Sequence, residues 1–184
     1  MWRALAILLV VVGVIALLTR TCAPPSALSS PSKTAGCVSQ SGLPDLACTP
    51  GSTDPRVTQS NIATTICRRG YTATVRPSVG VTEPIKRERM AAYGVAASQQ
   101  STVVLDHLVP LQLGGSPQDA ANLWPEPTTG PATASMKDAV ESYLNGEVCG
   151  GKMQLADAQR QIASDWLSVY NNRHLTPAQG PENP

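Results

Sequence analysis

Apolar residues are concentrated at the start of the chain and return in regular patterns only further on. Residues 4–18 form an uninterrupted apolar run behind Arg3, an order that is typical of export signals. As a helix at about 1.5 Å per residue, this run would span about 22 Å, less than a hydrocarbon core of about 30 Å. Pro24 follows the best small-residue cleavage position, Ala23, and would block cleavage there. The pattern predicts export, with residues 1–22 as either a signal peptide or an N-terminal membrane anchor.

The stretch behind this run has little apolar patterning. Pro, Ser, Thr and Gly dominate residues 23–53, a composition typical of linkers. We therefore expect a linker there, one folded domain over residues 54–172 and a disordered polar tail over residues 173–184. A chain of 184 residues is long enough for one such domain with its own core.

The first part of the domain combines a strand pattern with a helix pattern. β-branched residues alternate over residues 71–76 and stop at Pro77, which predicts a short strand. Thr82 can cap a helix that reaches Tyr93 and is stopped by Gly94.

A hairpin and two helices are predicted next. Residues 102–109 have strand character, residues 114–117 form a Gly-Gly-Ser-Pro turn, and the chain can return as a strand at 122–124. Helices are predicted over residues 135–145, up to the glycine that follows, and over residues 155–170 with one apolar face. The predicted fold class is α+β, with a hairpin followed by helices.

Composition and charge change this picture little. The formal net charge is +1, so no overall positive field marks the chain as a nucleic-acid binder. Phe is absent, and the core must rest on aliphatic residues and tryptophan. We expect Trp124 and Trp166 to lie in the core, because Trp124 follows the hairpin residue Leu123 and Trp166 lies on the apolar face of the last helix.

Four cysteines remain when Cys22, beside the apolar run, is set aside. They are Cys37, Cys48, Cys67 and Cys149, an even count that fits an oxidising compartment reached by export. Of the possible pairings, 37–48 and 67–149 is the simplest, because Cys67 and Cys149 lie within the domain and the other two in the predicted linker. A bridge between Cys67 and Cys149 would contribute about 4–5 kcal/mol through loop-closure entropy.

Three polar residues of the predicted hairpin suit phosphodiester hydrolysis. This reaction needs a base for the water, a group that orients the base, and a cation that stabilises the developing charge. His107 can be the base, Asn122 can hold the loop of His107, and the carboxylate of Asp106 can bind a hard cation such as Mg²⁺. Neighbours on a strand point to opposite faces, so the strand must end or bulge here if both are to reach one phosphate.

The extended pattern resembles a known signature. Residues 106–115 read Asp-His-Leu-Val-Pro-Leu-Gln-Leu-Gly-Gly and residues 122–124 read Asn-Leu-Trp, which resembles the motif of HNH-type (His-Me finger, ββα-metal) endonucleases. Residues 54–170 also resemble small secreted bacterial proteins in which the same core is followed by Trp-x-Glu-Pro and Lys-Asp-x-x-Glu, here at 124–127 and 137–141.

The resemblance implies a ββα-metal core, in which a β-hairpin and a helix surround a single divalent ion. It gives His107 the role of base, Asp106 that of metal ligand and Asn122 that of orienting residue. The implied cofactor is one Mg²⁺ or Mn²⁺ ion, and the implied substrate is DNA or RNA.

One metal ligand of the HNH pattern is missing. These domains usually carry a second metal-binding His about nine residues after the Asn, and this chain has Pro131 there. A carboxylate can replace it for a hard cation. We expect Asp138 to do so, with Glu141 and Glu126 as alternatives. An ordinary negative first helical turn explains Asp138 and Glu141 nearly as well.

Basic side chains gather between residues 68 and 89. Because nucleic acids are bound mainly through their phosphates, we expect this segment to contact the substrate, although a solvated helix face explains its later members equally well. The expected contacts are Arg68, Arg69, Arg76, Arg87 and Arg89.

Together these features predict an exported, metal-dependent nuclease of low sequence specificity. We expect it to act as a monomer, secreted or anchored on the outer face of the cytoplasmic membrane through residues 4–18. The alternative is a non-catalytic extracytoplasmic binding domain on a degenerate HNH-like scaffold, which the missing ligand favours.

Overall fold

A computed structural model describes residues 30–178 of the chain. Its sheet is one antiparallel hairpin of β1 (Val103–His107) and β2 (Leu123–Pro127), in which Asp106 faces Trp124 and His107 faces Leu123. The helices are α1 (Tyr71–Val75), α2 (Val79–Ala92), α3 (Ala134–Cys149) and α4 (Leu155–Asn172). Short 3₁₀ turns lie at Gln59–Thr64, Ala97–Thr102, Leu111–Leu113 and Ala120–Asn122.

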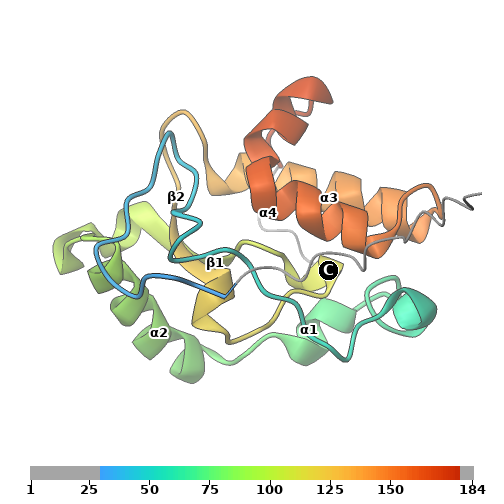
Figure 1. Cartoon of the computed structure of the whole chain (residues 1–184), viewed down its shortest axis with the longest axis horizontal. Coiled ribbons are helices and arrows are strands. Elements are labelled where there is room, and N and C mark those ends of the chain that lie inside the picture. The colour runs from blue at the N-terminus through green and yellow to red at the C-terminus, as the bar shows by residue number, and fades with distance from the viewer. Residues whose placement is uncertain (1–29, 179–184) are drawn as a thin grey trace, which may run out of the picture.

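The hairpin lies in the middle of the molecule (Figure 1). Helix α2 packs along one side of it, and α3 and α4 pack against each other on the other side. The predicted α+β class, with a hairpin followed by helices, is confirmed.

The core lies mainly between α3 and α4, where apolar residues follow helical spacing on the facing sides. Val140, Leu144, Ile162 and Trp166 are fully buried there, and full burial of such side chains contributes about 1.5–3 kcal/mol each. Trp124 is also fully buried, with its ring centroid 6.4 Å from that of Tyr93. Both tryptophans are core residues, as predicted.

Two disulfides staple the fold. Cys37 pairs with Cys48 and Cys67 with Cys149, with Cα–Cα distances of 5.9 Å and 5.5 Å, so the predicted pairing is confirmed. Such bridges suggest a protein outside the cytosol. Among residues 30–178, no helix is both long and apolar enough to cross a membrane.

The predicted strand at residues 71–76 is wrong, because residues 71–75 form the short helix α1. A strand needs a partner for its backbone groups. The described part of the chain has one two-stranded sheet, and this segment lies outside it. Gly70 turns the chain into the helix with a positive φ of 77°, a conformation that glycine adopts readily.

Two helix ends differ from their predicted positions. Helix α2 begins at Val79, before the predicted cap Thr82, so Pro84 lies inside it. Helix α3 runs past Gly146 to Cys149. Burial of Val148 and the disulfide at Cys149 hold this last turn in place, which outweighs the weak helix propensity of one glycine.

Part of the predicted linker is folded onto the domain. The Cys37 backbone N–H donates to the Ala92 carbonyl at the end of α2 (3.0 Å), and the hydroxyl groups of Thr49 and Tyr93 are hydrogen-bonded at 2.7 Å. At the other end, Ala178 in the predicted tail donates to the Ser135 carbonyl at 2.8 Å. The predicted signal or anchor segment lies outside the described residues.

Candidate active site

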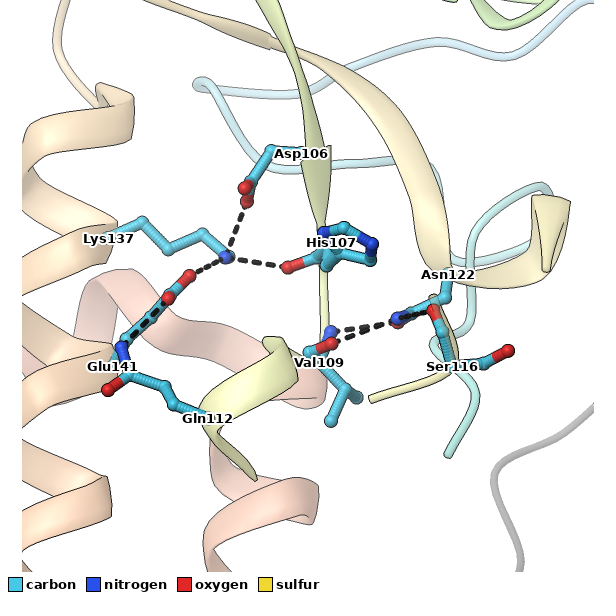
Figure 2. Close-up of polar contacts among 8 residues, drawn as sticks. All are labelled: Asp106, His107, Val109, Gln112, Ser116, Asn122, Lys137 and Glu141. Atoms are coloured by element: carbon cyan, nitrogen blue, oxygen red, sulfur yellow. Dashed lines mark hydrogen bonds and ion pairs between the residues drawn. The ribbon is translucent and has the colours of Figure 1, made fainter. Parts of the chain in front are cut away.

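The end of β1 brings two of the three predicted hairpin groups to one cleft. Asp106 and His107 are the last two residues of the strand, and their side chains leave it in different directions (Figure 2). Both line a cleft of about 320 Å³, together with Arg76, Asp138 and Glu141. The strand ends here, as is needed if neighbouring side chains are to border one cleft.

The ring of His107 is fixed by a backbone carbonyl. Its Nε2 lies 3.0 Å from the carbonyl oxygen of Pro117, and because a carbonyl only accepts, Nε2 carries the proton. In the neutral ring Nδ1 is then the basic nitrogen. Burial lowers the pKa of His107 below its usual value, against an opposing effect of Asp106. The ring is therefore neutral at physiological pH, as a general base must be.

Asn122 is fully buried and uses its whole amide. Its Oδ1 accepts from the backbone N–H groups of Val109 (2.8 Å) and Ser52 (3.2 Å). Its Nδ2 donates to the carbonyls of Val109 (2.9 Å) and Ser116 (3.0 Å). Asn122 thus holds the loop that precedes Pro117, whose carbonyl fixes His107. The structure links Asn122 to His107 through this loop, and no hydrogen bond joins the two side chains directly among the described residues.

The Gly-Gly pair of the motif allows this loop to close. A Cβ at Gly115 would lie 1.7 Å from the Val109 carbonyl oxygen and 3.0 Å from Asn122 Nδ2. Gly114 has a φ of +71°, and a Cβ there would lie 2.7 Å from a methyl carbon of Val57. Any larger residue at Gly115 would separate Asn122 from the chain that it holds.

Lys137 of α3 lies on the side of β1 opposite Asn122, and its side chain is fully buried (Figure 2). Its ammonium group donates to Asp106 Oδ2 (2.6 Å), to the His107 carbonyl (2.7 Å) and to Glu141 Oε1. The other carboxylate oxygen of Glu141 accepts from the side-chain amide of Gln112 at 3.1 Å. The sequence analysis missed Lys137, although its spacing of four residues from Glu141 is a signal for an ion pair on one helix.

Three carboxyl groups surround this ammonium group and differ in their protonation. Burial opposes the charge on Asp106, but Lys137 and a hydrogen bond from Glu126 outweigh it and lower the pKa of Asp106. Burial raises the pKa of Glu126 well above its usual value, and it raises that of Glu141 to about 7. Burial would lower the pKa of Lys137, but the carboxylates outweigh it and raise that pKa. These pKa directions favour the charged forms of Asp106 and Lys137 and the protonated form of Glu126.

These residues do not fit the expected metal ion. Asp138 and Asp106 line the same cleft, but Asp106 Oδ2 is engaged by Lys137. Residues 30–178 contain no group of three or more His, Cys, Asp or Glu side chains arranged to hold a metal ion. Of the alternative ligands, Glu141 is paired with Lys137, and Glu126 is fully buried, which raises its pKa and disfavours the charged form that a metal ion needs.

The predicted phosphate contacts fall into two groups. Arg76 is exposed and lines the His107 cleft. Arg68 and Arg69 are exposed and line a second cleft of about 310 Å³, which shares Thr72 and Gln112 with the first. These three arginines therefore border adjoining clefts.

The other two arginines lie on α2, outside these clefts. Arg87 is exposed and lines neither cleft. Arg89 does not fit its predicted role, because it is only 3% exposed. Its guanidinium donates to the carbonyl of Leu123 (2.9 Å) and the hydroxyl of Thr49 (3.1 Å), so Arg89 joins α2 to β2 and the folded N-terminal segment.

Comparisons with known proteins do not place the chain in a family. No protein-family model, no curated protein and no solved structure matched it. The resemblance to HNH endonucleases therefore rests on the motif residues alone.

Proposed function

We propose that this domain is an extracytoplasmic nuclease that hydrolyses phosphodiester bonds with low sequence specificity, and that His107 is its general base. The observation that supports it most is the His107 ring, which is held at Nε2 by Pro117, kept neutral by burial, and placed in a cleft beside the exposed Arg76. A fixed neutral imidazole next to an anion-binding side chain is the arrangement that hydrolysis of a phosphodiester requires.

The proposed reaction uses few groups of the chain. Water attacks the phosphorus atom, and its proton passes to Nδ1 of His107 as the new P–O bond forms. The bond from phosphorus to the leaving sugar oxygen breaks, and that oxygen takes a proton from solvent. Arg76 stabilises the charge on the other phosphate oxygens, and Asn122 keeps the His107 loop in register. No step passes through a metal ion, because Asp106 and Glu141, two of the carboxylates expected to bind one, are paired with Lys137.

The adjoining clefts support a nucleic acid as the substrate. Arg76 borders the His107 cleft and Arg68 and Arg69 border its neighbour, so a chain of phosphates can contact both. Sequence readout needs side chains presented to base edges. The arginines of these clefts supply phosphate contacts instead, so we propose low specificity.

Cleavage of plasmid DNA, single-stranded DNA and RNA by the full-length protein, produced with both disulfides, tests the proposal. We expect cleavage of at least one of these substrates. Arg76→Ala should weaken binding and reduce the salt dependence of the apparent affinity by about one unit of slope. Arg87→Ala, which removes an exposed arginine outside both clefts, is the matched control and should change neither. Absence of cleavage by the wild type would contradict the proposal.

A non-catalytic binding domain is the second candidate. The observation that favours it is the pairing of Asp106 with Lys137, which uses inside the fold a carboxylate that the HNH motif offers to a metal ion. A wild-type protein that binds DNA or RNA through Arg76 and leaves it intact would support this candidate.

A further inference from the structure

The Lys137 cluster offers the oxygen atoms that a divalent cation would bind. Its ammonium group contacts two carboxylate oxygens, from Asp106 and Glu141, and one backbone carbonyl oxygen, from His107. Carboxylate and carbonyl oxygens are the preferred ligands of Ca²⁺, Mg²⁺ and Mn²⁺. These oxygens surround an ammonium group that lies beside the candidate active site.

We propose that Lys137 is a built-in cation, which takes the position of a divalent metal ion between Asp106, Glu141 and the His107 carbonyl. Lys137 is accordingly a positioning residue. Its three N–H groups are all donated within the protein, and none remains for a substrate. It fixes Asp106 and the backbone of His107, the residue that acts on water.

The geometry excludes an ammonium group and a metal ion at the same point. The two Lys137 distances to Asp106 and His107 are 2.6 and 2.7 Å, whereas Ca²⁺ binds oxygen at about 2.3–2.6 Å. An ion within bonding distance of the same oxygens would lie almost on top of Nζ. If the ammonium group were removed, the oxygens of Asp106, Glu141 and the His107 carbonyl would remain. Their distances from the vacated Nζ position are close to those that a bound Ca²⁺ ion needs.

Metal binding tests this inference without any assumption about nuclease activity. Mn²⁺ binding is measured by electron paramagnetic resonance, and Ca²⁺ binding by the shift of the thermal midpoint. Any Mn²⁺ binding by the wild type should be the same in Asp106→Asn, because Lys137 occupies the site. Ca²⁺ should leave the thermal midpoint of the wild type unchanged. Lys137→Ala should have a lower midpoint, because buried carboxylates lose their partner. It should gain a site for one ion, and Ca²⁺ should raise its midpoint.

Two further variants separate charge from space. Lys137→Met removes the charge but fills the volume with an apolar chain, so it should bind the ion more weakly than Lys137→Ala. Adding Asp106→Asn to Lys137→Ala should weaken binding by at least about tenfold, since it replaces a negatively charged ligand by a neutral amide. A folded Lys137→Ala that binds no ion would overturn the inference. Should that variant not fold, Mn²⁺ binding by the wild type that is lost in Asp106→Asn would overturn it.

A second measurement rests on the proposed function. If Lys137 replaces the metal ion, cleavage by the wild type in excess EDTA should stay within about twofold of the rate in Mg²⁺. Cleavage that EDTA abolishes and Mg²⁺ restores would overturn the inference while supporting the nuclease. Absence of cleavage under both conditions would contradict the nuclease alone, because the metal-binding measurements stand independently.

Discussion

Around His107 the polar groups are held mainly by residues close in sequence, whereas Asp106 is held by a lysine from a distant element, α3. His107 contacts Pro117, 10 residues away, and Asn122 bonds Val109, 13 residues away. Asp106 contacts Lys137, 31 residues away on α3. The first region consists of hydrogen bonds between neutral groups, and the second of an ammonium group among carboxyl groups.

This difference shows that the motif of residues 106–122 fixes the position of His107 through its own residues, but not that of Asp106. The His107 side depends on a tight loop whose Gly115 permits close approach and whose Asn122 fills every hydrogen-bonding position. The Asp106 side depends on how α3 packs and on which carboxyl groups keep a proton. The two regions should therefore respond differently to mutation, to loss of the staple on α3 and to pH.

The largest effect expected in the first region is on cleavage. His107→Ala should lower the rate by about 10²–10⁴-fold, because it removes the base that accepts the proton of water. Since burial lowers the pKa of His107 below its ordinary value of 6.5, the wild-type rate should begin to fall with acid only below that pH. His174→Ala, at an exposed position after α4, is the control and should keep the wild-type rate. Equal rates for both variants would remove His107 from the mechanism.

The stability of the second region should depend most on the Cys67–Cys149 disulfide, which fixes the end of α3. Replacing both Cys67 and Cys149 by Ser should cost about 4–5 kcal/mol of unfolding free energy, because the bridge spans 82 residues. The same change at Cys37 and Cys48, which are separated by 11 residues, should cost about 2.5–3 kcal/mol. Urea denaturation of both variants measures the difference. An equal loss in the two would show that loop closure does not set the contribution of the α3 staple.

The sequence predicted the first region better than the second, for a physical reason. The turn glycines and the position of Asn122 are consequences of a continuous motif. The strand character of residues 102–109 and 122–124 located the hairpin, although β1 ends earlier, at His107, and β2 runs on to Pro127. Pairing of Lys137 with Asp106 needs α3 to pack beside the end of β1, and no local pattern specifies that packing. The helix at residues 71–75 and the burial of Arg89 were missed for the same reason, since neighbours distant in sequence decide both.

Asn122→Ala should be the most destabilising single change in the first region. It would leave the buried backbone groups of Val109 and the carbonyl of Ser116 without partners, at a cost of about 3–4 kcal/mol. Asn171→Ala, at an exposed position in α4, should change stability by less than about 0.5 kcal/mol. Chemical denaturation measures the unfolding free energy of both variants against the wild type. A loss below about 1 kcal/mol for Asn122→Ala would mean that the loop holds its shape without the amide.

The smallest effect expected concerns pH and belongs to the second region. Burial raises the pKa of Glu126 well above its ordinary value of 4.5, so the native protein keeps a proton that the unfolded chain releases above that pH. Where the unfolded state binds fewer protons, stability falls as pH rises, by up to about 1.4 kcal/mol per pH unit.

The variant Glu126→Gln tests this expectation. Its side chain cannot titrate, yet its amide can donate a hydrogen bond to Asp106 as the protonated carboxyl group does. As the pH rises above 4.5, the wild type should therefore lose stability relative to Glu126→Gln. Glu88→Gln, at an exposed position on α2, controls for the loss of one surface carboxylate. Parallel stability curves for wild type and Glu126→Gln would mean that Glu126 is ionised in the native protein, beside the carboxylate of Asp106.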